Sequence, residues 1–316
     1  MKIIVTGGAG FIGSHITDRL LKEKNQVLCI DNFDNFYDIK EKQKNIESHL
    51  KNRDYKLAEG DITDKNFISK TINDFLPEAI IHLAAKTAVR PSINTAELYY
   101  HSNVTGTLNL LEAIKDKKNI KFIFTSSSSV YGLNTKVPFE EKDSILNPAS
   151  PYASTKIAGE SLCFSYHYNY KIPVVILRLF SVYGTRQRPD LAVRKFIERI
   201  CRGEEISVFG DGGTSRDYTH VYDITDGFCR ALDYTKKSFD IFNLGNSEPV
   251  KLIDLIGIIQ KVSGIKPRIR YENFQQGDVP ITYADISKAR KILGYKPTVE
   301  LKTGISEMVD WVQGKL

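Results

Sequence analysis

Short strand-like runs alternate with helical stretches through the first 180 residues of this chain. The runs, rich in β-branched and aliphatic residues, lie at about 2–6, 26–31, 55–59, 79–83, 120–126 and 173–178. Strands that alternate with helices pair in parallel, because each helix carries the chain back across the sheet. The pattern therefore predicts an α/β fold of the Rossmann type, a doubly wound parallel sheet with helices on both faces.

The alternation becomes irregular after residue 180, where loops rich in glycine and proline begin, such as the run at 210–213. A chain of 316 residues also exceeds what one compact core usually holds. We expect a first domain over 1–178 and a smaller α/β substrate-binding domain mainly over 179–316, with segments that return to the first domain. Long helices are expected at about 92–118 and 150–170.

A glycine-rich loop follows the first strand and opens an amphipathic helix. Its glycines are Gly7, Gly10 and Gly13, with Phe11 and Ile12 between the last two. The first two glycines let the backbone turn sharply and approach a pyrophosphate, and the third permits close packing of helix on strand. The N-terminus of the helix adds N–H donors and the positive end of its dipole. The loop therefore predicts a dinucleotide site.

Asp31 closes the second strand, where a carboxylate can hold both hydroxyls of the adenosine ribose. Its charge would repel the 2′-phosphate of NADP, and Asn32 and Phe33 follow it in place of an arginine. NAD is therefore favoured over NADP. An ordinary turn residue is the other interpretation of Asp31, and the glycine loop makes it the weaker one.

Tyr152 and Lys156 are four residues apart on a helix predicted to begin near Pro151, so both side chains lie on one face. A lysine ammonium and the positive nicotinamide of bound NAD favour phenolate over phenol, which makes the tyrosine a general base. Such a pair is common on helices. The serine run 126–129, at the end of a strand where doubly wound sheets bind ligands, strengthens the prediction.

Charge and composition favour a soluble protein that binds small molecules. The net charge is +6, but Lys40, Lys42 and Lys44 alternate with residues such as Glu41 and carry no aromatic platform for bases, so we predict a solvated face and no nucleic acid partner. No segment is long and apolar enough to span a membrane, and no signal peptide precedes Ile3, which predicts a cytoplasmic protein. The four cysteines show no C-x-x-C pattern, so we expect buried thiols and no metal.

Together, Gly7-x-x-Gly10-x-x-Gly13, Asp31-Asn32, the run from Ser126 to Gly132 and Tyr152-x-x-x-Lys156 resemble the extended short-chain dehydrogenase/reductase family. Within it, the chain is similar to the NAD-dependent nucleotide-sugar epimerases. The similarity covers nearly the full length, and its later motifs are Arg216-Asp217-Tyr218, Gly245-Asn246 and the stretch from Gly277 to Asp285.

The resemblance implies roles for further residues. Those implied to flank adenine, to line the cofactor cleft and to lie near the cofactor are, in that order, Asp61 and Ile62; Leu83, Ala84 and Ala85; and Lys86 and Asn103. Ser127 would assist Tyr152, and Lys156 would also bind the nicotinamide ribose. Arg216 would grip the diphosphate, a bidentate task that suits guanidinium. A second diphosphate arginine is replaced by Phe274-Gln275-Gln276, and Asp278 of the next motif is predicted to bind substrate.

The resemblance also implies a reaction. Tyr152 as phenolate removes the proton of the sugar 4-hydroxyl while the C4 hydride passes to NAD, which gives a 4-keto sugar. If that intermediate turns over, the hydride returns with inverted C4 configuration and NAD is restored. Related dehydratases carry an Asp-Glu pair, and decarboxylases a Glu, just before the Val-Tyr-Gly motif, where this chain has Ser128 and Ser129. We therefore predict an isomerase, a UDP-sugar 4-epimerase.

The segment after the sixth strand bears on the sugar. Glucose/galactose epimerases usually read Arg-Tyr-Phe-Asn there, whereas Ser181 replaces the asparagine here, and uronic-acid epimerases favour a hydroxyl residue followed by a stretch like 186–190. The donors predicted for a carboxylate at C5 are Ser127, Ser128, Ser129 and Ser181, with Arg90 or Arg188. The other interpretation is that serines of this region only satisfy backbone groups, which is credible for Ser126 and Ser129. We favour conversion of UDP-glucuronate to UDP-galacturonate.

Three alternatives stay open at this point. UDP-glucose/UDP-galactose epimerases share nearly every motif, and the small Thr282 keeps UDP-N-acetylglucosamine open as a substrate. A non-catalytic NAD-sensing regulator would keep the glycine loop, although such proteins commonly lose the tyrosine or lysine. The resemblance further suggests a homodimer packed through the two long helices.

Overall fold

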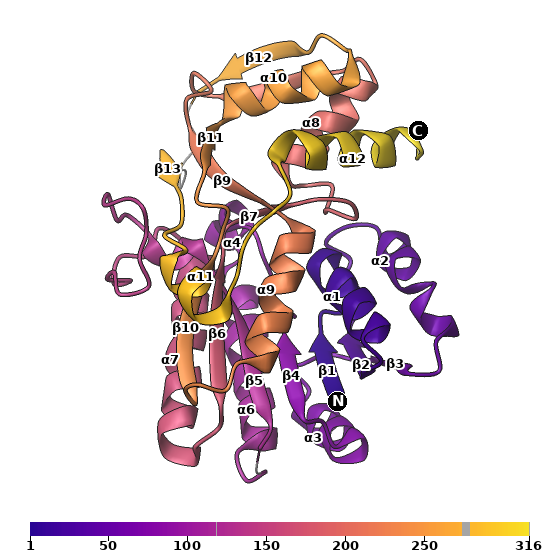
Figure 1. Ribbon diagram of the computed structural model, residues 1–316, viewed down its shortest axis with the longest axis vertical. Helices are drawn as coiled ribbons and strands as arrows, with labels where there is room; N and C mark the ends of the chain where they lie inside the picture. The colour runs from indigo at the N-terminus through magenta and orange to yellow at the C-terminus, as the bar shows by residue number, and fades with distance from the viewer. Residues whose placement is uncertain (118, 274–278, 316) are drawn as a thin grey trace.

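A seven-stranded parallel sheet forms the centre of the computed structural model, which describes residues 1–117, 119–273 and 279–315 (Figure 1). The strand order is β10-β6-β5-β4-β1-β2-β3. In chain order the strands are β1 (Lys2–Thr6), β2 (Gln26–Asp31), β3 (Tyr55–Glu59), β4 (Ala79–His82), β5 (Lys121–Ser127), β6 (Val174–Leu179) and β10 (Phe239–Leu244). The predicted doubly wound α/β fold is confirmed.

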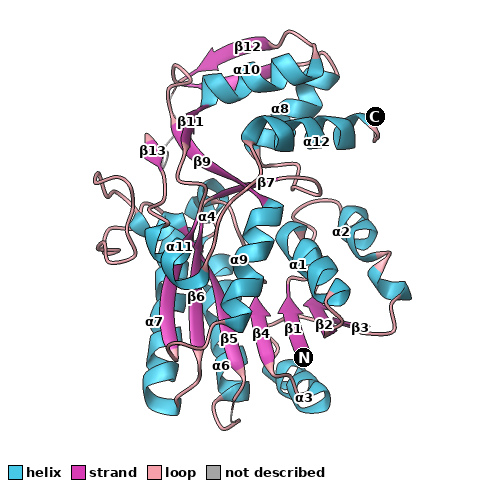
Figure 2. Cartoon of the chain, viewed as in Figure 1, coloured by secondary structure: helices cyan, strands magenta, loops and turns pink. Residues whose placement is uncertain are grey.

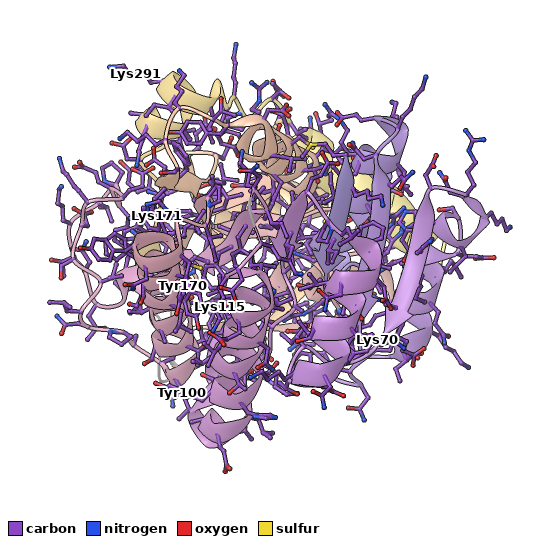
Figure 3. The ribbon with its side chains drawn as sticks, turned by 90° about the horizontal axis from the view of Figure 1, so that it is seen from below. Lys70, Tyr100, Lys115, Tyr170, Lys171 and Lys291 are labelled. Carbon is purple, nitrogen blue, oxygen red and sulfur yellow. The ribbon has the colours of Figure 1, made fainter. Side chains whose placement is uncertain are left out.

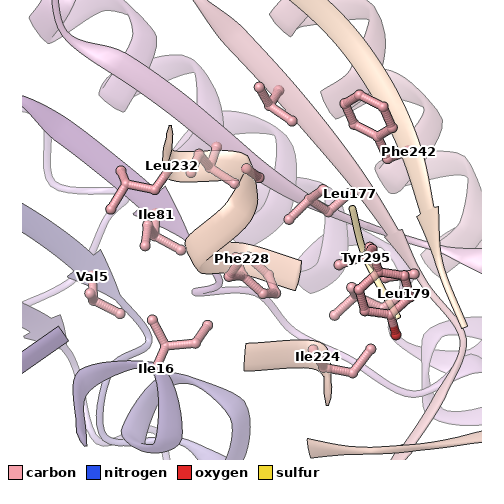
Figure 4. Packing of buried hydrophobic residues seen from close by; sticks show 14 of the residues in the cluster. Val5, Ile16, Ile81, Leu177, Leu179, Ile224, Phe228, Leu232, Phe242 and Tyr295 are labelled. Carbon is pink, nitrogen blue, oxygen red and sulfur yellow. The ribbon is translucent and has the colours of Figure 1, made fainter. Parts of the chain in front are cut away.

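Alternate residues of each strand point to opposite sides of this sheet, and because both sides are apolar, helices cover both faces. On β1, Ile3 and Val5 pack into the core beneath α1 (Phe11–Lys22) and α9 (Val221–Asp233), part of which is drawn in Figure 4. Ile4 faces the opposite core, which is closed by α3 (Lys65–Phe75), α6 (Gly106–Ile114) and α7 (Pro151–Tyr170). Both faces of the strands are therefore buried, as a parallel sheet requires.

Two elements differ from the sequence-based expectations. The helix expected over 92–118 is divided into α4 (Val89–Asn94), α5 (Ala96–Tyr100), the π-helical segment η2 (His101–Thr105) and α6. The break after α4 falls at Thr95, whose φ of −135° leaves the helical region. The second difference is β10, which pairs with β6 although no strand was predicted there. Its apolar run is interrupted by the polar residues Asp240 and Asn243, so it lacks the pattern of a buried strand.

A smaller unit lies beyond the carboxyl ends of the sheet strands, at the top of Figures 1 and 2. Its strands are β7 (Ser181–Tyr183), β8 (Glu205–Phe209), β9 (Ser215–His220), β11 (Pro249–Lys251), β12 (Arg268–Glu272) and β13 (Ile281–Thr282). Its helices α8 (Ala192–Cys201), α10 (Leu252–Ser263) and α12 (Leu301–Gln313) share a separate apolar core, which includes Phe196, Ile256 and Met308.

The remaining helical elements are α2 (Ile39–Ile46), η1 (His49–Lys51), η3 (Ser128–Tyr131) and α11 (Ser287–Leu293). Of these, η3 follows β5 directly, so the serine run lies where the strand ends and the chain turns. Among the described helices, none combines the length and apolar character that crossing a bilayer requires.

Candidate active site

One cavity of about 830 Å³ lies at the carboxyl ends of the central strands and extends to β7 and β9 of the smaller unit. Doubly wound sheets bind their ligands at this edge. The cavity brings together most residues that the sequence singled out. They are Gly7, Gly10, Phe11, Ile12, Gly13, Asp31, Asn32, Asp61, Ile62, Leu83, Ala84, Ala85, Lys86, Ser127, Tyr152, Lys156, Ser181, Arg188 and Arg216.

The glycine loop has no room for side chains at two of its positions. Gly7 has a φ of +70°, and a Cβ there would lie 2.8 Å from the backbone nitrogen of Ala84. A Cβ on Gly13 would lie 2.2 Å from the carbonyl oxygen of Gly7. No side chain caps the first turn of α1, where Gly10 is the N-cap residue, so its N–H groups suit an anion such as a pyrophosphate.

Asp31 is buried at the end of β2, with 6% of its surface exposed. Its carboxylate accepts hydrogen bonds from the backbone N–H of Ala9 at 3.1 Å and of Phe33 at 2.9 Å. A carboxylate has about four acceptor sites, so this leaves acceptors for the two hydroxyls of a ribose. The loop and Asp31 together fit the pyrophosphate and adenosine ribose of NAD.

Lys42 was missed as a residue of this site, because the sequence prediction placed it on a solvated face. That prediction is wrong for Lys42, which is 8% exposed and lines the cavity. The helical period puts Lys42 on the inner face of α2 with the buried Asn45 and Ile46. Its Nζ lies 3.6 Å from Asp31 Oδ1, so its charge offsets part of the carboxylate charge. The spacing of Lys42 to Ile46 was the available signal.

Lys156 lies at the centre of the cavity wall on α7, which is capped by Ser150 through the backbone N–H of Ala153. The ammonium donates a hydrogen bond to the carbonyl oxygen of Thr125 at 2.8 Å and lies 5.2 Å from the centre of the Phe124 ring. Burial lowers the pKa of Lys156 to about 8, against the raising effect of Cys163 and Glu160. The side chain therefore has a pKa close to neutral pH.

Tyr152 stands one helical turn before Lys156, with its ring edge-on to Tyr99 at a centroid distance of 6.3 Å. Burial raises the pKa of Tyr152 above its ordinary value, while a hydrogen bond from Ser127 and the charge of Arg188 act to lower the same pKa. Ser127 is held in turn, since its Oγ accepts the backbone N–H of Ser129 at 3.1 Å. The three predicted catalytic side chains therefore meet at one wall.

Arginines and a hydroxyl group mark the other end of the cavity. Arg188 pairs with both carboxylate oxygens of Asp190 at 2.9 and 2.7 Å and donates to the hydroxyl of Thr87. Ser181 enters from β7 and Arg216 from β9. Asp190 offsets the charge of Arg188, but these contacts use only three of the five N–H donors of that guanidinium. The remaining donors of Arg188, together with the guanidinium of Arg216, suit the diphosphate and any carboxylate of an anionic substrate.

Asn103 does not line the cavity but lies behind its wall. Its amide oxygen accepts the backbone N–H of Lys86 at 2.7 Å, and its amide nitrogen donates to the hydroxyl of Thr155 on α7 at 3.0 Å. Asn103 therefore holds the loop around Lys86 against helix α7, which carries Tyr152 and Lys156.

Three residues predicted to bind substrate lie outside the cavity lining, and one is not described. The guanidinium of Arg90 lies 4.9 Å from the Phe209 ring centre, toward β8. Thr282 is the β13 neighbour of Arg216, and Ser128 begins η3. Asp278 lies outside the described residues. Over residues 1–117, 119–273 and 279–315, no three His, Cys, Asp or Glu residues gather in a way that could hold a metal ion.

The sequence profile of the GDP-mannose 4,6-dehydratase family matches residues 4–308. A UDP-glucuronate 4-epimerase of Thermodesulfobacterium geofontis is 38% identical over 98% of this chain and 95% of its own.

Solved structures agree with the sequence comparison. The UDP-glucuronic acid 4-epimerase of Bacillus cereus, in complex with UDP-glucuronic acid and NAD, superposes with a TM-score of 0.94 at 38% identity, and all of both chains is covered. The UDP-glucose 4-epimerase of Thermotoga maritima with UDP-glucose has a TM-score of 0.92 at 32% identity, covering 100% of this chain and 99% of the other.

Proposed function

Because this chain belongs to the nucleotide-sugar branch of the extended short-chain dehydrogenase/reductase family, we propose that it is an NAD-dependent 4-epimerase that converts UDP-glucuronate to UDP-galacturonate. The observation that carries the proposal is the meeting of Ser127, Tyr152 and Lys156 at one wall of a cavity. That cavity has a dinucleotide cradle at one end and arginines at the other.

Each of these side chains has a task in the proposed reaction. Tyr152 takes the proton of the sugar 4-hydroxyl and later returns it, and Ser127 donates a hydrogen bond to the phenolate. Lys156, one helical turn after Tyr152, would stabilise that phenolate through its positive charge. Bound NAD supplies the hydride acceptor and donor for C4, and its positive nicotinamide favours the phenolate further. The protein leaves the cofactor oxidised after each cycle, so the net reaction is an isomerisation.

Elimination of water is a different outcome of the same keto sugar, and the matching family profile carries the name of a dehydratase. By the family resemblance, a dehydratase would have an Asp-Glu pair where this chain has Ser128 and Ser129. A hydroxyl group at neutral pH is a poor acid and a poor base for that second step. Return of the hydride is therefore the outcome that these residues favour.

The choice of UDP-glucuronate rests on Arg188 and Ser181, which line the cavity. A guanidinium and a hydroxyl can hold the carboxylate at C5 with charge-assisted hydrogen bonds. UDP-glucose is the second candidate, because the Thermotoga maritima structure named above carries that ligand on the same fold. UDP-N-acetylglucosamine is the third.

A direct assay distinguishes these substrates. Purified protein is incubated with UDP-glucuronate, UDP-glucose or UDP-N-acetylglucosamine without added NAD, and the products are separated by chromatography. We expect UDP-galacturonate at the highest kcat/KM. A higher kcat/KM for either neutral sugar would overturn the substrate assignment, and loss of water from the product would overturn the epimerase.

Assembly and location complete the proposal. We propose a homodimer, because the last turns of α7 expose the large side chains Phe164 and Tyr168, which stack on one another, and Tyr170. Tyr170 is labelled in Figure 3. Sedimentation that gives the mass of one chain would contradict the homodimer.

We propose that the protein is located in the cytoplasm, with the four free thiols as support. We also propose a division of the chain into residues 1–178, which bind NAD, and mainly residues 179–316, which bind the UDP-sugar.

A further inference from the structure

A buried ion pair lies directly behind the catalytic wall. Glu160 of α7 and Arg178 of β6 have side chains that are 5% and 3% exposed. Glu160 Oε2 accepts from Arg178 Nη2 at 2.7 Å and Glu160 Oε1 accepts from Arg178 Nε at 2.9 Å, so the contact is bidentate. A charge pair costs free energy to bury, and this one serves no part of the reaction described above.

Glu160 continues the face of α7 that carries the catalytic residues. It stands one turn after Lys156, which stands one turn after Tyr152. Its Oε1 also accepts a hydrogen bond from the Ser126 hydroxyl at 2.5 Å, and Ser126 is the residue before Ser127 on β5. The carboxylate therefore joins the helix that carries the base to the strand that carries its hydroxyl partner.

Close packing makes this junction sensitive. A Cβ on Gly159 would lie 2.3 Å from the Phe124 ring, which shows how tightly α7 approaches β5. Arg178 is itself fixed at its far end, where Nη1 donates to the Tyr131 hydroxyl at 3.1 Å and to the carbonyl oxygen of Glu141 at 3.2 Å. Tyr131 in turn donates to Asn243 on β10 at 2.6 Å. The hydrogen bonds around Glu160 and Arg178 therefore join β5, β6 and β10.

We propose that Glu160 is a positioning residue, which seats α7 on β5 through Arg178 and Ser126 so that Lys156 stays charged and Tyr152 stays against Ser127. The inference rests on the proposed function only for its kinetic readout. The titratable groups that act on Lys156 are Glu160 and Cys163 of α7 and His82 of β4. Tyr152 stands one turn before Lys156 on the same helix, and Arg178 of β6 is paired with Glu160. Burial lowers the pKa of His82 to about 3 and raises the pKa of Cys163, so the carboxylate of Glu160 supplies the negative charge among these groups.

The test compares Glu160→Gln with Glu41→Gln. Glu41 of α2 forms the matched pair, since both its oxygens accept from Arg194 of α8 at 2.6 Å, the Arg194 side chain is 4% exposed, and Glu41 does not line the cavity. Each change removes one carboxylate from a bidentate arginine pair. Arg194 keeps Glu198 as a second partner at 2.6 Å and Glu41 is more exposed than Glu160, so we expect the smaller loss of stability in Glu41→Gln. The comparison is therefore made on kcat and on the pKa of Lys156.

For Glu160→Gln we expect kcat to fall about 10- to 100-fold with KM within about threefold, because a catalytic group misplaced by about 1 Å can cost on the order of 100-fold. The unpaired Arg178 charge also lowers the pKa of Lys156 below its value of about 8, so the alkaline limb of the kcat profile moves to lower pH. Glu41→Gln keeps both the wild-type kcat and the wild-type pKa of Lys156.

A second readout needs no sugar. Acetic anhydride acetylates only the neutral amine, so the rate of Lys156 acetylation against pH, followed by peptide mass spectrometry, gives the pKa of Lys156 in each variant. If wild type turns over no UDP-sugar but Glu160→Gln still lowers this pKa, the proposed function fails and the positioning role stands. A wild-type kcat and pKa in Glu160→Gln, or an equal fall of kcat in Glu41→Gln, would overturn the positioning role.

Should Glu160→Gln fail to fold, Ser126→Ala takes its place, since it removes only the hydroxyl that joins β5 to Glu160. A fall of kcat by about threefold to tenfold at unchanged KM supports the proposal, in the range of one ordinary hydrogen bond. Wild-type kcat in a folded Ser126→Ala would overturn it.

Discussion

The two ends of the cavity are built in different ways. At the dinucleotide end, one stretch of chain from β1 to β2 supplies the loop glycines and Asp31, and the ligand-facing groups include backbone N–H groups and one carboxylate. At the proposed sugar end, the lining residues Ser181, Arg188 and Arg216 come from separate segments. They offer side-chain groups, one hydroxyl and two guanidiniums, in place of backbone N–H groups. The first end is fixed by local backbone geometry, and the second by tertiary packing. Tyr152 and Lys156 lie between them.

The difference shows which features can vary without loss of the fold. Side chains at the sugar end can be exchanged with little change to the sheet, whereas Gly7 and Gly13 contact the backbone of neighbouring segments. A substitution at the sugar end should therefore alter substrate choice, and one at the dinucleotide end should alter cofactor retention.

Tyr152→Phe is expected to have the largest effect, because it acts at the junction of the two ends. Loss of the general base should lower kcat by about 100- to 10,000-fold while NAD stays bound, since the ring still packs on Tyr99. Initial rates and the NAD released on denaturation are the measurements. Near-normal turnover would remove Tyr152 from the mechanism.

Arg188→Met tests the sugar end through KM, because loss of its charge also acts on the pKa of Tyr152 and so on kcat for every sugar. Loss of a charge-assisted contact to the C5 carboxylate should raise KM for UDP-glucuronate by about 10- to 100-fold, since hydrogen bonds to charged groups contribute about 1.5–3 kcal/mol. KM for UDP-glucose and the bound NAD should change little. An equal rise for both sugars would show that Arg188 does not read the carboxylate.

Gly13→Ala tests the dinucleotide end alone. The new Cβ would lie 2.2 Å from the Gly7 carbonyl oxygen, so helix α1 must shift away from the loop. We expect about tenfold weaker NAD binding and a loss of about 1–3 kcal/mol in the free energy of unfolding, as for an overpacked core site. Titration of NAD into protein stripped of cofactor measures the first, and urea unfolding the second. Unchanged NAD affinity would mean that the packing at Gly13 does not shape the cradle.

Lys42→Met should have the smallest effect on dinucleotide binding, and it tests how Asp31 discriminates between NAD and NADP. Without the ammonium 3.6 Å away, the Asp31 carboxylate repels a 2′-phosphate more strongly. We expect NADP affinity to fall by about tenfold and NAD affinity by about threefold, because the lost charge acts most strongly on the dinucleotide with the larger negative charge. Binding titrations with both dinucleotides provide the comparison. A gain in NADP affinity would contradict it.

Sequence predicted the dinucleotide end well because its determinants are local. The strands at 2–6, 26–31 and 55–59 match β1, β2 and β3 residue for residue, and the loop between the first two follows from the glycine spacing. Lys42 is the exception at this end. Its contact with Asp31 depends on how α2 packs against the sheet, and the residues that follow Asp31 directly along the chain do not indicate that packing.

The sugar end was less accessible to prediction, because it depends on which distant segments meet. Ser181 and Arg188 line the cavity as expected. Arg90 instead lies against the Phe209 ring, and Thr282 pairs with Arg216 across β13 and β9 without lining the cavity. The strand β10 was missed for a similar reason, since its polar residues are satisfied by partners remote in sequence, such as Lys288 for Asp240 and Tyr131 for Asn243.

In the proposed reaction, the C4 hydrogen leaves the sugar and returns to it within one closed cycle of bound NAD. UDP-glucuronate labelled with deuterium at C4 tests it directly, with the product examined by mass spectrometry and NMR. We predict UDP-galacturonate that retains the label at C4, formed without added NAD and without net reduction of the cofactor. Loss of the label to solvent, or recovery of UDP-glucuronate alone, would contradict the account.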